Sequence, residues 1–204
     1  MDMDTYTRDC CCFLDAIKAD LVDYVEKVNM DEIRAAAAMI IEAERRGNRV
    51  HVSGIGKPGH LAGYISSLMS STGTPTYFLH GTEAVHGSCG QLVPGDVVIF
   101  ISNSGETEEM KATVLAIKNN DCHVIGVSGN PLSWLGQNCE VHLFAGVPKE
   151  GGPLNRAPRM SILAETIVLQ ILSIYLQSYV NISPSEYVKR HPGGSLGRLR
   201  ADEK

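Results

Sequence analysis

Basic residues are not in excess in this 204-residue chain, where 18 lysines and arginines face 23 aspartates and glutamates for a formal net charge of −5. We therefore expect no nucleic-acid partner, because proteins meet phosphate backbones with a basic excess. The N-terminus, MDMDTYTRD, lacks the basic and then apolar segments of a signal peptide. The longest apolar stretch, 162–180, is interrupted by Glu165 and several amide and hydroxyl side chains, which argues against a bilayer span and a membrane partner.

The six cysteines show neither a disulfide framework nor the spacing of a zinc site. Cys10, Cys11 and Cys12 are adjacent, and the other three are far apart. This usage is typical of a reducing compartment, so we expect a cytoplasmic protein. Histidine pairs such as H-x-x-x-H or H-x-E are missing too, and no metal is predicted, although His86 and His191 could meet in space.

What the chain does contain is the composition of a folded globular protein, with 44% apolar and only 20% charged residues. No repeat or low-complexity linker divides it, and its length is about one and a third times that of a typical domain. We predict a single domain over 1–204. N-terminal helices would occupy 1–47, and a polar C-terminal arm without regular structure would occupy 181–204.

Two helices are predicted before the first strand. Apolar residues from Phe13 to Val28 recur every three or four positions, which is the pattern of one apolar helix face. A second helix over 32–46 would have Asp31 as its N-cap and end at Gly47. The apolar faces of both helices need burial, and another subunit is a candidate for covering them.

From residue 49 onward, short β-branched strands alternate with helical segments. This alternation predicts βαβ crossovers and a doubly wound α/β domain, flavodoxin- or Rossmann-like, with a five-stranded parallel sheet flanked by helices. Three histidines inside the strands, His51, His123 and His142, are expected to be packed and hydrogen-bonded. The first predicted strand ends near residue 54, and the other four cover 74–79, 96–102, 122–128 and 140–145. Besides the two N-terminal helices, we predict helices over 58–71 and 160–179 and a third that follows the 96–102 strand and its loop and ends at residue 118.

Two strand-to-helix junctions, 53–60 and 102–109, have unusual polar sequences. In open parallel sheets, ligands bind beyond the carboxyl ends of the strands, where both junctions lie. The second junction opens a helix, whose free N–H groups and dipole favour an anion, and Ser102, Ser104 and Thr107 would add hydroxyl donors. The pattern predicts a phosphate site. The alternative is that Ser104 and Thr107 merely cap the helix.

The first junction matches the dinucleotide pattern G-x-G-x-x-G through Gly54, Gly56 and Gly59. No acidic residue follows at the tip of the second strand to bind a ribose, so no cofactor is predicted. Lys57, in the middle of this junction, suits an anionic or carbonyl substrate better. Glu150, in the tight loop after the fifth strand, is either a general base or an ordinary solvated charge. His191, followed by Pro-Gly-Gly, suggests a stiff arm that presents one side chain.

Together these segments resemble the sugar isomerase (SIS) domain family and, within it, the arabinose-5-phosphate isomerases. The resemblance covers 32–200 and rests on motifs in the family's order: GIGKPGH, STGTP, GTEAVHGSCG, PGDVVIFISNSGETEE, PKEGGPLNRAP and RHPGGSLGR. SNSGET alone would indicate only a phosphosugar-binding SIS domain. STGTP followed by HPGGSLGR is more specific for the isomerase branch.

The resemblance implies roles for individual residues. Lys57, Glu109 and Glu150 match active-site residues, and His86 matches the histidine of the family's A-H-G motif. His191 matches a histidine brought in from a neighbouring subunit, which implies a homotetramer with sites at subunit interfaces. The sugar phosphate would be bound by the residues at the two junctions: Ser53, Gly54, Ser102, Asn103, Ser104 and Thr107.

The function implied is a phosphosugar aldose–ketose isomerase, interconverting ribulose 5-phosphate and arabinose 5-phosphate or a related sugar phosphate through an enediol(ate). Two departures bear on it. The segment 159–163, Arg-Met-Ser-Ile-Leu, replaces a run of serine and threonine near the substrate, and the chain ends before the position at which many members carry CBS domains. The alternatives are a non-catalytic phosphosugar sensor and a 6-phospho-3-hexuloisomerase.

Overall fold

The computed structural model describes residues 3–203 and contains the predicted five-stranded parallel sheet. Its order, β2-β1-β3-β4-β5, reverses between β1 and β3 and is therefore doubly wound. The strand bounds lie within two residues of the predicted ones. They are β1 Val50–Gly54, β2 Thr76–His80, β3 Val97–Ile101, β4 His123–Ser128 and β5 Val141–Phe144.

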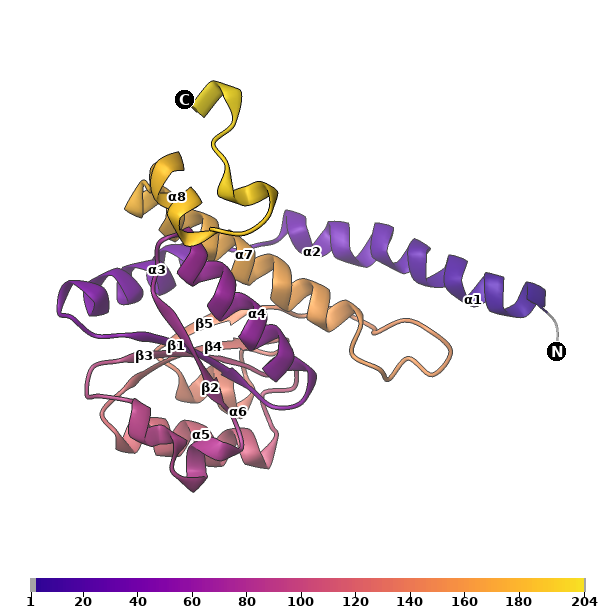
Figure 1. Cartoon of the computed structure of the whole chain (residues 1–204). Helices are drawn as coiled ribbons and strands as arrows, with labels where there is room; N and C mark the ends of the chain where they lie inside the picture. The colour runs from indigo at the N-terminus through magenta and orange to yellow at the C-terminus, as the bar shows by residue number, and fades with distance from the viewer. Residues whose placement is uncertain (1–2, 204) are drawn as a thin grey trace.

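Helices cover both faces of the sheet (Figure 1). On one face, α3 (Met30–Arg45), α4 (Lys57–Thr72) and α7 (Met160–Val180) pack on alternate strand residues such as Val52 and Ile99. On the other face, α5 (Glu108–Asn119), α6 (Trp134–Asn138) and the 3₁₀ turns η2 (Glu83–His86) and η3 (Ser88–Gln91) pack on the intervening residues, including Phe100. The central strands are apolar on both sides because both sides are covered.

The N-terminal helices α1 (Met3–Ala16), the π-helix η1 (Ile17–Leu21) and α2 (Val22–Glu26) form one long segment that projects from the layers in Figure 1. Tyr24 anchors it, because its hydroxyl donates to the Phe144 carbonyl oxygen at 2.9 Å. The predicted N-cap Asp31 is wrong. Asn29 caps α3, and its side chain accepts a hydrogen bond from the Asp31 amide.

Helix α7 is long and apolar enough, by length and composition alone, to cross a membrane, and half of its most apolar 18-residue stretch is buried within the domain. It packs between α3 and α4, and residues such as Val168 and Leu172 lie in the core. The sequence argues against a bilayer span because polar residues interrupt this stretch. The packing is that of a core helix.

The C-terminal segment contains more regular structure than predicted. Ser183 and Glu186 form a capping box, in which each side chain bonds the other's backbone N–H, and they open α8 (Pro184–Arg190). Two 3₁₀ turns follow, η4 (Ser195–Gly197) and η5 (Ala201–Glu203). The expectation of a polar arm without regular structure from residue 181 is therefore wrong.

Candidate functional site

The loops that follow β1, β2, β3 and β5 meet at the carboxyl edge of the sheet. Gly54 ends β1 and pairs with His80 of β2 on one side and Ile101 of β3 on the other. A Cβ atom on Gly59 would stand 2.7 Å from the Gly54 carbonyl oxygen. Glycine is therefore required for the close approach of α4 to the strand, which accounts for part of the G-x-G-x-x-G pattern without a nucleotide.

The loop between β3 and α5 carries four of the predicted phosphate-binding residues. The buried Ser102 hydroxyl accepts a hydrogen bond from the Gly105 amide at 3.3 Å, and the exposed Ser104 hydroxyl accepts one from the Glu106 amide at 3.3 Å. Thr107 occupies the N-cap position of α5, but its side chain makes no capping hydrogen bond. The capping alternative therefore fails for Thr107, whose hydroxyl remains available to a ligand at the helix N-terminus.

Ser53 and Lys57 flank the turn from β1 into α4. Ser53 is fully buried, and its hydroxyl has no hydrogen-bond partner among the described residues. Leaving a buried hydroxyl unpaired costs about 1–3 kcal/mol, so a ligand oxygen that reached it would recover free energy. Lys57 is the first residue of α4 and is exposed, so its ammonium group can reach solvent at the same edge.

Glu150 links the phosphate loop to α7. One carboxylate oxygen, Oε2, accepts hydrogen bonds from the amides of Arg159 at 2.7 Å and Ser161 at 3.1 Å, so the side chain caps the N-terminus of α7. The other oxygen, Oε1, accepts a hydrogen bond from the side-chain nitrogen Nδ2 of Asn103 at 3.5 Å. The Glu150 amide in turn donates to the Asn155 side chain at 2.8 Å. Glu150 is thus held in place, half-buried, beside the predicted phosphate site, and is not merely a solvated charge.

Glu165 is a further candidate site residue, which the sequence motifs did not indicate. It is fully buried on α7, and neither of its carboxyl oxygens has a hydrogen-bond partner within residues 3–203. Burial and the nearby Glu150 raise the pKa of the Glu165 carboxyl to about 8. An acidic residue in the middle of an otherwise apolar helical stretch was the available signal.

Glu109 and His86 lie on elements that pack together, α5 and η2. Both side chains are exposed. The Thr113 hydroxyl ties α5 to the loop before η2 by donating to the Gly81 carbonyl oxygen at 2.6 Å. The structure thus brings Lys57, His86, Glu109, Glu150 and the two junctions to one edge of the sheet.

His191 lies elsewhere. It ends α8, where its ring stacks on Tyr187 at 4.1 Å and its Nδ1 atom lies 2.9 Å from the Tyr187 carbonyl oxygen. Helix α8 contacts α4, and Arg190 lies beside Gly73, just past the end of α4. Since α4 starts at the carboxyl edge of the sheet, its end marks the opposite edge. Within one chain, His191 therefore does not join His86 or the other predicted site residues.

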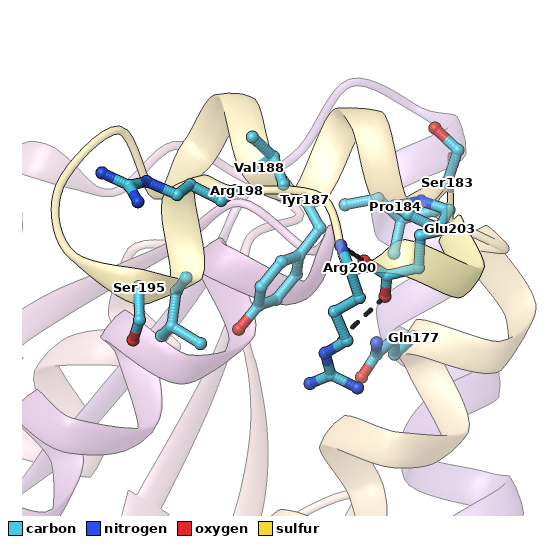
Figure 2. Close-up of a pocket in the computed structure, with 11 residues that line it drawn as sticks. Gln177, Ser183, Pro184, Tyr187, Val188, Ser195, Arg198, Arg200 and Glu203 are labelled. Atoms are coloured by element: carbon cyan, nitrogen blue, oxygen red, sulfur yellow. Dashed lines mark hydrogen bonds and ion pairs between the residues drawn. The ribbon is translucent and has the colours of Figure 1, made fainter.

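A hollow of about 270 Å³ lies between α8 and the C-terminal turns (Figure 2). Arg200 and Glu203 form an ion pair there at 4.0 Å, and Tyr187 lines its wall. None of its lining residues belongs to a loop that follows a strand. This hollow is separate from the strand-end site.

Two of the three histidines in strands are packed as predicted. His51 is buried, with Nε2 3.1 Å from Asp96 Oδ2, and His142 Nε2 lies 2.8 Å from the Ser128 hydroxyl oxygen. His123 is exposed at the start of β4, so for it the prediction is wrong.

Comparison with known proteins gives consistent matches. A model of the SIS domain family matches residues 45–175, a range that contains all five strands and both junctions. The arabinose 5-phosphate isomerase KdsD of Francisella tularensis is 38% identical over 180 residues, which are 87% of this chain and 55% of that protein. The chain spans about half the length of the curated relatives that it matches.

Two solved structures share the fold along nearly the whole chain. The protein c3406 of Escherichia coli CFT073, solved in complex with arabinose 5-phosphate, has a TM-score of 0.80 at 30% identity and covers 94% of this chain and 100% of its own. A proposed phosphosugar isomerase of Bacteroides fragilis, connected with capsule formation, has a TM-score of 0.82 at 33% identity and covers 89% of this chain and 96% of its own.

Proposed function

The chain belongs to the SIS domain family, and on that premise we propose that it is an aldose–ketose isomerase acting on a sugar phosphate. The preferred pair is arabinose 5-phosphate and ribulose 5-phosphate. The similarity to KdsD and to the Escherichia coli protein with bound arabinose 5-phosphate supports this choice. The observation that carries the proposal is the 3.5 Å contact between Asn103 and Glu150, which joins a fixed carboxylate to the predicted phosphate loop.

In this proposal the phosphate lies at the N-terminus of α5. The helix N–H groups and the Thr107 hydroxyl would donate to it, and the unpaired Ser53 hydroxyl would donate from the neighbouring strand end. Anion binding at a helix N-terminus needs no metal or cofactor. The sugar would then extend toward Lys57 and Glu150.

Isomerisation needs a base, an acid and a stabiliser of an oxyanion. A carboxylate, Glu150 or Glu109, removes a proton from the carbon beside the carbonyl group and returns it to the former carbonyl carbon. In the same interconversion, the hydroxyl proton of the neighbouring carbon moves to the former carbonyl oxygen, and a new carbonyl group is left behind. Lys57 stabilises the enediolate oxygen. A histidine, His86 or His191, transfers protons when the aldose ring opens, because an imidazole titrates near neutral pH.

We further propose a homotetramer in which His191 completes the site of a neighbouring subunit. The apolar side chains exposed on α1 and α2 support a second copy as their cover, including Leu14 at 55% exposure and Val22 at 52%. Mixing two inactive variants tests the arrangement. His191→Asn and Glu150→Gln subunits should regain activity when co-assembled, and co-assembled mixtures that stay inactive would contradict it.

A cytoplasmic location is part of the same proposal. All six cysteines are free, and three of them are exposed side by side on α1, as a reducing compartment allows.

The function is tested with a panel of pentose and hexose phosphates followed by NMR. Turnover of arabinose 5-phosphate is the expected result, and turnover of a 3-hexulose 6-phosphate alone would favour the hexuloisomerase. Tight binding of one sugar phosphate without turnover would favour the sensor. Retention of Lys57 and both glutamates argues against a sensor, which needs only the phosphate loop.

A further inference from the structure

Glu165 is a buried carboxyl group that the proposed chemistry leaves unused. It lies on α7 one turn after Ser161, and both side chains are fully buried. Neither the Ser161 hydroxyl nor either carboxyl oxygen of Glu165 has a hydrogen-bond partner among residues 3–203. A charged carboxylate without a partner is too costly to bury, so such a group normally remains protonated.

No cation is paired with Glu165 in the described part of the chain. From α2, Tyr24 faces it, but the tyrosine hydroxyl donates to the carbonyl oxygens of Phe144 and Ala164. From η1, which packs on α7, Asp20 is paired with Lys149 at 3.5 Å. Lys57 and His60 on the first turn of α4 are both exposed, and Glu32 on α3 accepts the Phe144 amide.

Besides burial, Glu150 is the carboxylate that raises the pKa of Glu165, and it accepts the amide of Ser161, one turn before Glu165 on α7. It is fixed as an acceptor of two amides at the N-terminus of α7, a position that favours a negative charge. A second negative charge on Glu165, in a region shielded from water, would be repelled by the first. The geometry therefore divides the pair into an anionic Glu150 and a neutral Glu165.

We propose that Glu165 is a positioning residue for Glu150, an inference that rests on the proposed function with Glu150 as its base. As a neutral acid it allows the Glu150 carboxylate to stay on the N-terminus of α7 and beside Asn103. When it ionises, it repels that carboxylate and withdraws the base from the sugar. The pair thereby gives the enzyme a built-in loss of activity at alkaline pH.

The first test observes the two carboxyl groups directly. Protein labelled with ¹³C at the glutamate side chains is titrated by NMR, and Glu165 is assigned through the Thr166 backbone amide. The expected result is that Glu165 titrates near pH 8 and that the Glu150 resonance shifts over the same range. In Glu165→Gln, the alkaline shift of Glu150 disappears. The proposal is overturned if Glu165 titrates below pH 6, or if the chemical shift of Glu150 does not change while Glu165 titrates.

The second test measures kcat and KM against pH. In wild type, kcat should fall about tenfold from pH 7 to pH 9 with little change in KM, because a base is displaced while phosphate binding is kept. In Glu165→Gln, the fall should be less than about twofold. Glu44→Gln is the matched control, because burial also raises the pKa of Glu44 but this residue lies on α3, away from the site. It should keep the wild-type profile.

The two tests separate the failure of this inference from the failure of the proposed function. If no sugar phosphate is turned over, the proposed function fails, and the NMR titration still decides whether Glu165 governs Glu150. If wild type is an isomerase but Glu165→Gln retains the full alkaline decline, the proposed function stands and the positioning role is wrong.

Discussion

Two buried carboxyl groups lie at opposite edges of the same sheet and have opposite surroundings. At the amino edge, Asp96 accepts hydrogen bonds from the amides of Arg49 and Val93, and His51 lies within 3.1 Å. Burial raises the pKa of Asp96, but these hydrogen bonds outweigh it and hold the pKa below its ordinary value. At the carboxyl edge, Glu165 has no partner among the described residues, and its pKa is raised to about 8.

The contrast teaches which edge serves stability and which serves function. A saturated carboxylate such as Asp96 ties the starts of β1 and β3 together and has no capacity left for a ligand. Unpaired groups such as Ser53 and Glu165 reduce stability, and this cost is typical of sites that bind or transform something.

The largest expected effect is on turnover when Glu150 is neutralised. Glu150→Gln keeps an oxygen that can accept the α7 amides but removes the base, so kcat should fall about 10²–10⁴-fold while sugar phosphate binding changes far less. Steady-state kinetics and calorimetry measure both quantities. The matched control is Glu42→Gln, which alters a surface glutamate paired with Arg46 at the C-terminal end of α3 and should leave kcat unchanged. If Glu150→Gln is as active as the control, Glu109 becomes the candidate base.

The next effect concerns Glu165 and stability. The pKa of Glu165 is about 8 in the folded protein, above its ordinary value of 4.5. Between these two pH values the folded state therefore binds one proton more than the unfolded state, and the free energy of unfolding falls as pH rises. Glu165→Gln removes this dependence. In denaturant unfolding, the free energy of unfolding of the variant should rise relative to that of wild type by on the order of 2–4 kcal/mol between pH 5 and pH 8. If the free energies of unfolding of wild type and Glu165→Gln change with pH in parallel, Glu165 is charged in the folded protein and this prediction is wrong.

Asp96 should behave in the opposite way. Asp96→Asn removes a hydrogen-bonded buried charge and should lower the free energy of unfolding at pH 7 by about 2–3 kcal/mol. Since the folded pKa of Asp96 is depressed, the stability it contributes is lost as pH falls, and the difference from wild type should shrink toward pH 3. Turnover by the folded variant should be unchanged. A large loss of kcat in Asp96→Asn would show that the amino edge also contributes to catalysis, and the assignment of separate roles to the two edges would be wrong.

The smallest effect distinguishes a phosphate ligand from a helix cap. Thr107→Ala should weaken sugar phosphate binding by about 1–2 kcal/mol, the contribution of a charge-assisted hydrogen bond, and leave stability nearly unchanged. Ser183→Ala is the comparison, because Ser183 does cap α8. It should reduce stability by about 1 kcal/mol without affecting binding. A loss of stability in Thr107→Ala with unchanged affinity would restore the capping explanation.

The sheet was predictable because its strands are short apolar runs bounded by glycine and polar turns, and their alternation with helices permits few topologies. Helix ends were less predictable. Asn29 and Asp31 are both good N-caps, and the backbone decides between them, because Asn29 is extended and the helix already begins at Met30. The capping box at Ser183 was visible in the sequence, but the polar composition of 181–204 hid it.

The candidate site was predictable where residues follow strand ends, as Ser102 and Glu150 do. The hydrogen bonds that these side chains make, or leave unmade, could not be predicted from the sequence. That Thr107 does not use its hydroxyl as a cap, and that Glu150 caps α7 next to Asn103, depends on the packing of distant segments. The isolation of Glu165 is likewise a property of the folded core, since an acidic residue on a helix is usually solvated.

The central claim, that the carboxyl edge is an isomerase site, is tested most directly by ¹H NMR of wild type with arabinose 5-phosphate in D₂O. We expect the ketose to appear and solvent deuterium to enter at the carbon beside the carbonyl group, because the abstracted proton can exchange with solvent on the base. Saturated binding with neither ketose formation nor deuterium exchange would contradict the claim.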